Sequence, residues 1–230
     1  MKISILTLFP NLFDPFLSTS ILGRALKKGL VEYEVVDIRQ FGEGKHKVVD
    51  DKPFGGGVGM VLRADILTKA WKSIVSPLTI NHKPYTILMS ASGTPLTQAK
   101  AKSLSKFDHL IIVCGHYEGV DQRFIDACID EEISIGDYVL TGGEIPAMVV
   151  VDTTVRLIPQ VLAKVEATED ESFTRGTLEY PQYTRPESFE GQKVPEILLS
   201  GNHQEIKKWR EEQALKKTEQ IRPDLIKKGH

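Results

Sequence analysis

The stretch "HLIIVCGHYEGVDQR", residues 109–123, joins an apolar run to a loop that contains two glycines. The run at residues 109–115 predicts a β-strand, because it is short, continuous and bounded by polar residues. A short helix is expected after Asp121. A strand that is apolar throughout is buried on both faces, which is typical of a parallel sheet with helices on both sides.

The same alternation extends in both directions from this stretch. Further strands are predicted at residues 3–9, 33–38, 85–90 and 132–135, and helices at residues 20–28, 64–75, 97–106 and 144–156. Thr97 is the expected N-cap of the third of these helices, and Pro146 falls in the first turn of the fourth. The predicted fold class is therefore α/β, with a mostly parallel sheet and helices on both faces.

The alternating pattern ends near the acidic stretch "EATEDESFTRG", residues 166–176. Residues 161–175 are polar and show no hydrophobic periodicity. Segments of this kind commonly separate domains, so we expect an interdomain linker here.

The residues beyond the linker are expected to be helical. Asn202, with Glu205 three residues later, is typical of a helix start. We therefore expect a cofactor-binding domain at residues 1–160 and a small all-α C-terminal domain at residues 176–230.

Composition excludes several classes of protein. The chain has 230 residues, of which 41% are hydrophobic and 26% charged, as in an ordinary soluble protein. No run approaches the roughly 20 apolar residues of a membrane span, and the N-terminus lacks a secretory signal, which predicts a cytoplasmic protein with no membrane partner. Cys114 and Cys128 are predicted to be buried free thiols.

Charge is distributed unevenly, although the net charge is only −2. Residues 124–155 contain seven acids and no Lys or Arg, so this stretch is not suited to a phosphate group. Residues 201–230 carry eight Lys or Arg against five acids. This helical tail could hold a polyanion, although a solvated helix face explains the same pattern.

Three glycine-bearing loops follow predicted strands, at residues 90–95, 114–123 and 135–146. Ligands of parallel sheets bind beyond the carboxyl ends of the strands, and glycine lets backbone approach a ligand closely. Each loop alone could be an ordinary tight turn. Three at corresponding strand ends predict a pocket for a flat molecule.

A fourth glycine cluster, "PFGGGVGM" at residues 53–60, has a different character. It does not follow a strand directly and has no Gly-Lys-Ser/Thr, so neither a dinucleotide fingerprint nor a P-loop is predicted. The same test disfavours an ordinary Rossmann-type methyltransferase. A mobile loop is expected here, with Asp50 and Asp51 at its entrance and Arg63 at its exit.

Five motifs in order resemble one family. The chain is similar to the bacterial tRNA (guanine-N1)-methyltransferases of the SPOUT superfamily along nearly its whole length. The motifs are "VDDKPFGGGVGM" (49–60), "VCGHYEGVDQR" (113–123), "SIGDYVLTGGEIPAM" (134–148), "YTRPE" (183–187) and "LLSGNHQEIKKWR" (198–210).

The resemblance implies properties that the residues alone do not. They are a trefoil knot at the C-terminal end of the cofactor-binding domain, and an obligate homodimer whose active sites are shared between chains. It also implies that S-adenosyl-L-methionine binds at Leu88, Met89, Ser90, Gly115, Tyr117, Glu118, Ile135, Gly136, Asp137, Tyr138, Val139, Leu140, Gly142, Gly143 and Pro146.

The implied substrate is tRNA, methylated at N1 of guanosine 37, just 3′ of the anticodon, where the modification maintains the reading frame. The glycine loop would bind the target guanine, and the C-terminal domain would bind the rest of the tRNA. The implied substrate-binding residues are Asp50, Gly55, Gly56, Gly57, Gly59, Ser200, Asn202 and His203.

The chemistry of guanine requires a base and a cation. N1 carries a hydrogen, and its removal pushes negative charge onto O6, so a carboxylate near N1 and an arginine near O6 would assist. The family's pattern places these roles at Arg156 and Glu171. Glutamate here replaces the family's aspartate, so the neighbouring Asp170 is the alternative base.

Two smaller departures concern the substrate loops. Val58 stands where the family commonly has proline, and Gln122 where it commonly has an acid. These changes affect the expected stiffness of the glycine loop and one polar contact.

Two other classes of function fit parts of the sequence. A SPOUT enzyme with another RNA target would lack the glycine loop and the basic tail, and a non-catalytic tRNA-binding protein would need no cofactor loops. No metal site is predicted, because the six histidines lie apart without ligand spacing. The resemblance connects the family's chemistry with Mg²⁺, but no residues here indicate a site for it.

Overall fold

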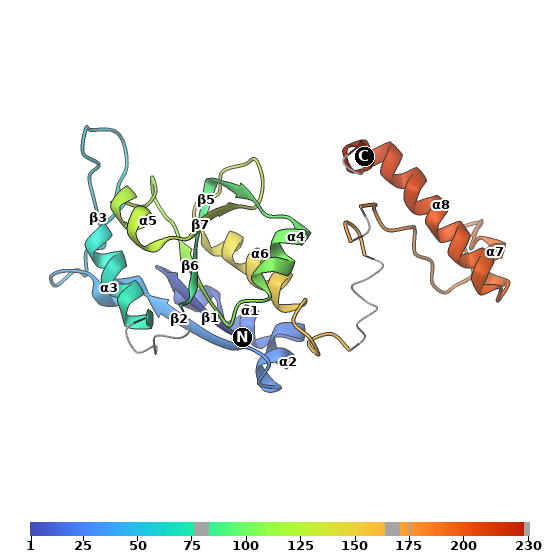
Figure 1. The fold of residues 1–230 in the computed structure, drawn as a ribbon, viewed down its shortest axis with the longest axis horizontal. Coiled ribbons are helices and arrows are strands. Elements are labelled where there is room, and N and C mark those ends of the chain that lie inside the picture. The colour runs from blue at the N-terminus through green and yellow to red at the C-terminus, as the bar shows by residue number, and fades with distance from the viewer. Residues whose placement is uncertain (76–82, 164–170, 175, 228–230) are drawn as a thin grey trace. The chain divides into compact units, whose positions relative to one another are not determined.

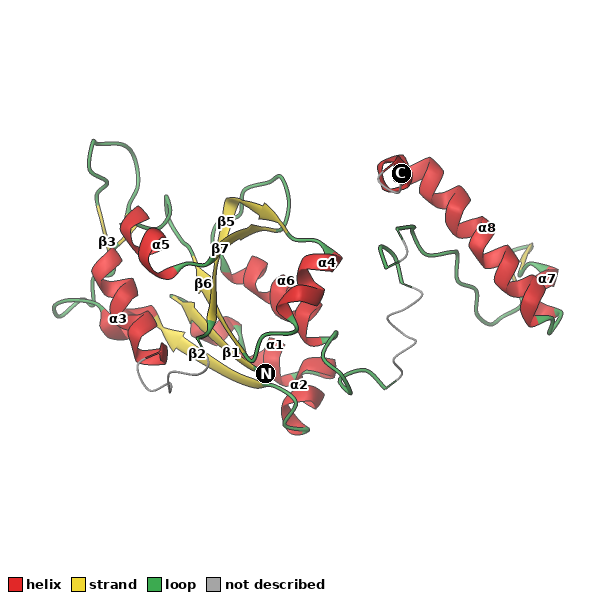
Figure 2. Cartoon of the chain, viewed as in Figure 1, coloured by secondary structure: helices red, strands yellow, loops and turns green. Residues whose placement is uncertain are grey.

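The computed structural model describes residues 1–75, 83–163, 171–174 and 176–227. The chain divides into two compact units, which we call unit 1 (Met1–Ala163) and unit 2 (Lys164–His230). Figure 1 shows the course of the chain, and Figure 2 the secondary structure of each unit.

Unit 1 is built on one parallel sheet (Figure 1). Its strands follow the order β2-β1-β6-β5-β7, and every neighbouring pair is parallel. The prediction of a parallel sheet is thus confirmed. The strands are β1 (Lys2–Thr7), β2 (Glu32–Asp37), β5 (Tyr85–Pro95), β6 (His109–Cys114) and β7 (Glu131–Ser134).

Side chains that alternate along the strands supply two separate cores. Ile112 belongs to a cluster with residues of α1 (Asp14–Ser18), α2 (Ser20–Lys27), α4 (Gln98–Leu104) and α6 (Glu144–Val155). Its neighbours on the strand, Ile111 and Val113, belong to a second cluster with residues of α3 (Ala64–Val75) and α5 (Gln122–Cys128). Helices therefore cover both faces of the sheet, because successive side chains of a strand point to opposite faces.

Side-chain caps start several helices where the sequence predicts them. The Thr97 hydroxyl accepts a hydrogen bond from the Lys100 N–H at 3.1 Å, and α4 follows. The carboxylate of Asp121 accepts one from the Arg123 N–H at 3.0 Å at the start of α5. Such caps satisfy N–H groups that have no partner within the helix, which fixes where the chain leaves a loop.

Strand β5 is longer than predicted. The sequence indicates a loop at residues 90–95, but β5 continues to Pro95 and pairs again with β7 after a shift of register between Met89 and Thr94. Gly93 allows this second pairing, since a Cβ there would lie 2.5 Å from the backbone of Ile133. The residues between the two paired parts are Ser, Ala, Ser and Gly, and such small side chains give no hydrophobic pattern by which a strand could be predicted.

Four short elements flank the glycine loop of residues 53–60 or follow strands of the sheet. Strands β3 (Asp50–Asp51) and β4 (Val61–Leu62) pair antiparallel on either side of it. Two 3₁₀ helices, η1 (Pro10–Leu12) and η2 (Ile38–Phe41), follow β1 and β2. None of these four elements is long enough to produce a hydrophobic pattern.

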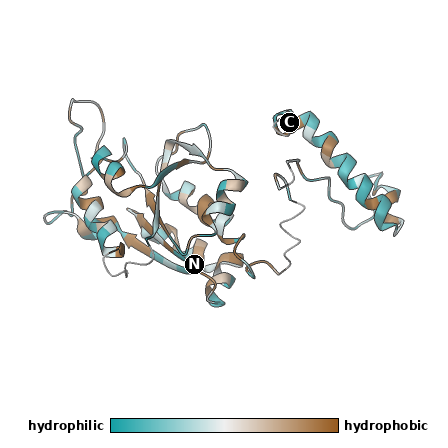
Figure 3. Cartoon of the chain, viewed as in Figure 1, coloured by the Kyte–Doolittle hydropathy of each residue, from teal (hydrophilic) through white to brown (hydrophobic). Residues whose placement is uncertain are grey.

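Unit 2 is mainly helical in its described part. It contains α7 (Glu196–Leu199), α8 (His203–Ile221) and α9 (Pro223–Lys227). Asn202 caps α8 as predicted, accepting hydrogen bonds from the N–H groups of Gln204 and Glu205. Figure 3 shows that most of α8 is hydrophilic.

Unit 2 also contains strands, which the prediction of an all-α domain did not include. Strands β8 (Ser188–Phe189) and β9 (Gln192–Lys193) form a small antiparallel hairpin. Its turn is made by Glu190 and Gly191, both with positive φ, which is the geometry of a tight hairpin turn. Two-residue strands leave no periodic signal, which explains why helix alone was expected.

Candidate functional site

A pocket lies at the carboxyl edge of the sheet in unit 1, where residues 88–92 of β5 meet the loops after β6 and β7. Its volume is about 440 Å³. Parallel α/β sheets bind ligands at this edge, because the loops there converge from neighbouring strands. The pocket is therefore the candidate functional site of unit 1.

Nearly all the residues that the family resemblance assigns to the cofactor line this pocket. The exception is Asp137, which is exposed in a turn closed by the Tyr138 N–H and the Gly136 carbonyl. The predicted residues that line the pocket are Leu88, Met89, Ser90, Gly115, Tyr117, Glu118, Ile135, Gly136, Tyr138, Val139, Leu140, Gly142, Gly143 and Pro146.

The loop after β7 lies directly against the loop after β6. The Gly143 N–H donates to the Gly115 carbonyl at 2.8 Å, and Gly142 forms an antiparallel bridge with His116. A Cβ on Gly143 would lie 2.7 Å from the Cα of Cys114. Glycine is needed here because only a bare Cα permits two backbones to approach so closely.

A buried hydrogen bond fixes the start of α6 beside the same loops. Glu144 and Thr7 are both buried, and the Thr7 hydroxyl donates to the Glu144 carboxylate at 2.8 Å. This contact joins the first turn of α6 to the end of β1. Burial, followed by the charge of Glu144, raises the pKa of the Cys114 thiol, so this thiol stays protonated.

His116 also lines the pocket, although sequence reasoning did not single it out. Its ring lies 5.3 Å from the ring of Phe9, measured between centroids. Its Nδ1 atom is buried and has no hydrogen-bond partner in the described part of the chain. The only signal in the sequence is its place between Gly115 and Tyr117.

The glycine loop approaches the pocket through Glu118. A Cβ on Gly59 would clash with the Glu118 side chain, which lines the pocket. The Glu118 N–H donates to the Met60 carbonyl, and the Leu62 N–H to the Gly119 carbonyl, both at 3.0 Å. One side of the glycine loop is thus attached to the loop after β6, which brings the two predicted binding segments together.

The other glycines of this loop sit in open space. Gly55, Gly56 and Gly57 all have positive φ, and a Cβ on Gly55 or Gly56 would meet no atom within 4 Å. Phe54 and Val58 are almost fully exposed, and Asp50 lies in β3 at the loop's entrance. Only glycine adopts such a run of left-handed conformations without strain.

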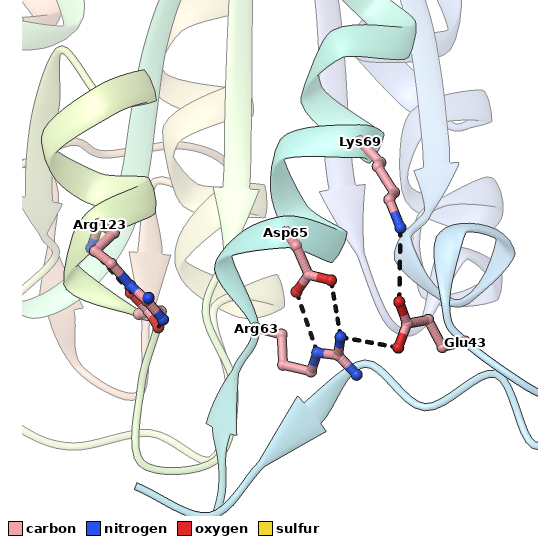
Figure 4. Close-up of polar contacts among 6 residues, drawn as sticks. Glu43, Arg63, Asp65, Lys69 and Arg123 are labelled. Atoms are coloured by element: carbon pink, nitrogen blue, oxygen red, sulfur yellow. Dashed lines mark hydrogen bonds and ion pairs between the residues drawn. The ribbon is translucent and has the colours of Figure 1, made fainter. Parts of the chain in front are cut away.

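Ion pairs brace the segments on either side of this loop (Figure 4). Arg63 contacts Asp65 through two hydrogen bonds of 2.8 and 3.1 Å and also lies 2.9 Å from Glu43. The second oxygen of Glu43 lies 3.8 Å from Lys69 of α3. The hydrogen bonds from Arg63 lower the pKa of Asp65, so the carboxylate stays charged at neutral pH.

The base and one of the tRNA contacts that the resemblance implies line the same pocket in unit 2. Glu171 and His203 both line a cavity of about 730 Å³, together with Lys207 and Arg210 of α8. Ser200 and Asn202 are exposed just before α8, where the Ser200 hydroxyl accepts a hydrogen bond from the Asn202 N–H at 3.1 Å.

Arg156 and the candidate bases are not brought together within one unit. Arg156 follows α6 as its C-cap and belongs to unit 1, whereas Glu171 belongs to unit 2. Asp170 lies outside the described residues.

Neither a membrane span nor a metal centre is found in the part of the chain that the structure describes. Among the described residues, no helix combines the length and the hydropathy that a bilayer span requires. Within the same residues, no three side chains of His, Cys, Asp or Glu form a group that could hold a metal ion.

The fold and the pocket together define an α/β protein with a candidate ligand pocket beyond the carboxyl ends of a parallel sheet. Residues 1–228 match the family model described as tRNA (Guanine-1)-methyltransferase TrmD. The chain belongs to this family.

Curated relatives named tRNA (guanine-N(1)-)-methyltransferase agree with this assignment. The protein of Ruminiclostridium cellulolyticum is 55% identical over 99% of this chain and 97% of its own length. That of Moorella thermoacetica is 51% identical over 98% of this chain and 90% of its own. That of Clostridioides difficile is 48% identical over the whole chain and 99% of its own.

The close approach of the two loops can be tested with a matched pair of substitutions. Gly143→Ala should lower the free energy of unfolding of unit 1 by about 1–3 kcal/mol, because the new methyl group has no room against backbone. Gly115→Ala should change it little, since a Cβ there meets its nearest atom at 3.4 Å. Urea unfolding followed by Trp71 fluorescence, in a Trp209→Phe background, measures both. Equal effects of the two substitutions would contradict the packing described above.

Proposed function

We propose that this protein transfers a methyl group from S-adenosyl-L-methionine to N1 of guanosine 37 of tRNA, next to the anticodon. Family membership supports the activity on guanine N1. The observation that carries the proposal further is that residues of β5 and of the loops after β6 and β7, assigned to the cofactor by resemblance, line one pocket. The position beside the anticodon and a role in maintaining the reading frame follow from the resemblance.

The charge of the pocket suits the proposed methyl donor. Glu118 and Glu132 are among the described residues that line the pocket, whereas no lysine or arginine is. A cationic sulfonium is favoured where carboxylates are near and cations are absent. When bound, S-adenosyl-L-methionine supplies an electrophilic methyl group. Gly115, Gly142 and Gly143 would let its flat adenine approach the backbone.

The glycine loop would present the target base to this pocket. Asp50, Gly55, Gly56, Gly57 and Gly59 are the proposed contacts with guanine. Gly59 lies against Glu118, and Glu118 lines the pocket, so a base held by the loop would lie near the donor. Such positioning contributes to the rate by replacing a chance encounter with a fixed geometry.

Glu171 is the proposed general base, and Arg156 the proposed stabiliser of charge on O6. Removal of the N1 proton makes N1 a nucleophile, and the negative charge that develops on O6 favours a nearby guanidinium. Asp170 is the alternative base. The cavity that Glu171 shares with His203, Lys207 and Arg210 is consistent with tRNA lying close to the carboxylate.

The remaining proposals concern architecture. We assign cofactor binding and a trefoil knot to residues 1–160, a linker to residues 161–175, and tRNA binding by a mainly helical domain to residues 176–230. Ser200, Asn202 and His203 are the proposed tRNA contacts there. The active form would be a cytoplasmic homodimer in which each site takes residues from both chains.

Two tRNA transcripts that differ at one nucleotide test the proposed activity. One has guanosine and the other adenosine just 3′ of the anticodon, and each is incubated with the purified protein and radiolabelled S-adenosyl-L-methionine. Only the guanosine transcript should acquire label, and nuclease digestion should yield 1-methylguanosine. Methylation of both transcripts, or of neither, would contradict the proposal.

Glu171→Gln tests the general base. The amide cannot accept the N1 proton, so methyl transfer in single-turnover assays should fall about 10²–10⁴-fold while tRNA affinity is kept. Asp170→Asn is the matched control and should retain most of the rate. A near-normal rate in Glu171→Gln, with a large loss in Asp170→Asn, would move the role to Asp170.

Mixing two inactive variants extends this test to the proposed shared sites. Leu140→Arg places a cation in the donor pocket and should repel the sulfonium. If each site combines the pocket of one chain with the carboxylate of the other, mixing Leu140→Arg with Glu171→Gln should restore activity through heterodimers. If the two variants exchange chains and the mixture still has no activity, the proposal that the active sites are shared between chains is wrong.

A further inference from the structure

A small hairpin precedes the glycine loop in unit 1. Glu43 and Val48 pair in both directions, with N–H to carbonyl distances of 3.0 and 2.9 Å, and the Lys47 N–H donates to the Gly44 carbonyl at 3.2 Å. The next residue, Val49, is buried, and its carbonyl accepts from the Arg63 N–H at 3.0 Å. Backbone hydrogen bonds thus make residues 43–48 a hairpin, which we call the basic hairpin.

The tip of the basic hairpin is positively charged. Lys45, His46 and Lys47 are consecutive and exposed. Neither lysine forms an ion pair with any residue that the structure describes. The two lysines are only two positions apart, and ammonium groups so close together repel one another, so this region favours an anionic partner.

The acid in the same hairpin is already neutralised. Glu43 lies 2.9 Å from Arg63 and 3.8 Å from Lys69, as Figure 4 shows. These ion pairs attach the base of the hairpin to the body of unit 1. Because Glu43 is paired in this way, it does not neutralise Lys45 or Lys47.

The basic hairpin is joined to the glycine loop by a very short connection. Strand β3 (Asp50–Asp51) begins two residues after the hairpin ends, and a further exposed cation, Lys52, follows it. Lys47 is six residues from Pro53, and six extended residues span about 20 Å at most. An RNA whose base entered the glycine loop would bring its neighbouring phosphates within reach of the hairpin.

We propose that the basic hairpin binds phosphates of the tRNA backbone beside the target guanosine, through Lys45 and Lys47. The inference rests on the proposed function and gives unit 1 its own contact with the RNA backbone, separate from the basic helix of unit 2. Phosphate contacts of this kind set position and register rather than sequence preference. Each releases counterions from the RNA, so its contribution weakens as salt rises.

The double variant Lys45→Ala/Lys47→Ala tests this proposal in the full-length protein. Its tRNA affinity at about 0.1 M salt should fall by roughly tenfold, and the slope of log affinity against log salt should become shallower by about 1.4 to 1.8, because two phosphates are no longer neutralised. Affinity for S-adenosyl-L-methionine, and the single-turnover rate at saturating tRNA, should stay within about twofold of the wild type. The control is Lys102→Ala/Lys106→Ala, which removes two exposed lysines in and just beyond α4 and should leave the tRNA slope unchanged.

The outcomes separate this proposal from the function on which it rests. If the wild type methylates the guanosine transcript but the hairpin variant binds tRNA with unchanged affinity and slope, the hairpin proposal is wrong. The same holds if the control variant loses as much affinity. If the wild type methylates no guanosine transcript, the proposed function itself fails.

Discussion

The contact on which the site depends is the approach of Gly143 to Cys114 and Gly115. A hydrogen bond of 2.8 Å from the Gly143 N–H to the Gly115 carbonyl joins the loops after β6 and β7. The close approach leaves no room for a side chain, so the two loops adjoin one another in the lining of one pocket. It also places Glu144 where Thr7 can bind it, which ties α6 to the first strand. Loosening the contact would widen the pocket and release α6.

Charge separates the two proposed ligands. The described lining of the pocket contains carboxylates and no lysine or arginine, which favours a cationic sulfonium. Exposed cations occur elsewhere, among them those of the basic hairpin in unit 1 and of α8 in unit 2. A polyanion held by the basic hairpin would, in the proposed function, approach the donor at the glycine loop. This arrangement would let a protein of net charge −2 bind both proposed ligands, a cation and a nucleic acid.

The parts of the fold that sequence predicted are those with strong local signals. Apolar runs indicated β1, β5 and β6, and capping residues indicated the starts of α4 and α8. The second half of β5 was missed because its pairing with β7 resumes after an irregular segment of small residues. Strands β8 and β9 are too short for any periodicity. Gly59 contacts Glu118, which lies 59 positions later in the sequence, and a local sequence pattern cannot predict such a long-range contact. The family resemblance predicted most residues that line the pocket, but it did not predict His116. The burial of its Nδ1 atom can be seen only in the folded structure.

The central claim is that the methyl donor binds in the pocket of unit 1. Ultraviolet crosslinking of S-adenosyl-L-methionine labelled in its methyl group, followed by trypsin digestion and mass spectrometry, tests it directly. Trypsin cleaves after Lys106, Arg123 and Arg156, so the loops after β6 and β7 fall in the peptides 107–123 and 124–156. The account predicts label in these two peptides, and its loss on addition of excess unlabelled donor. Label confined to unit 2, or to peptides of unit 1 that do not line the pocket, would contradict it.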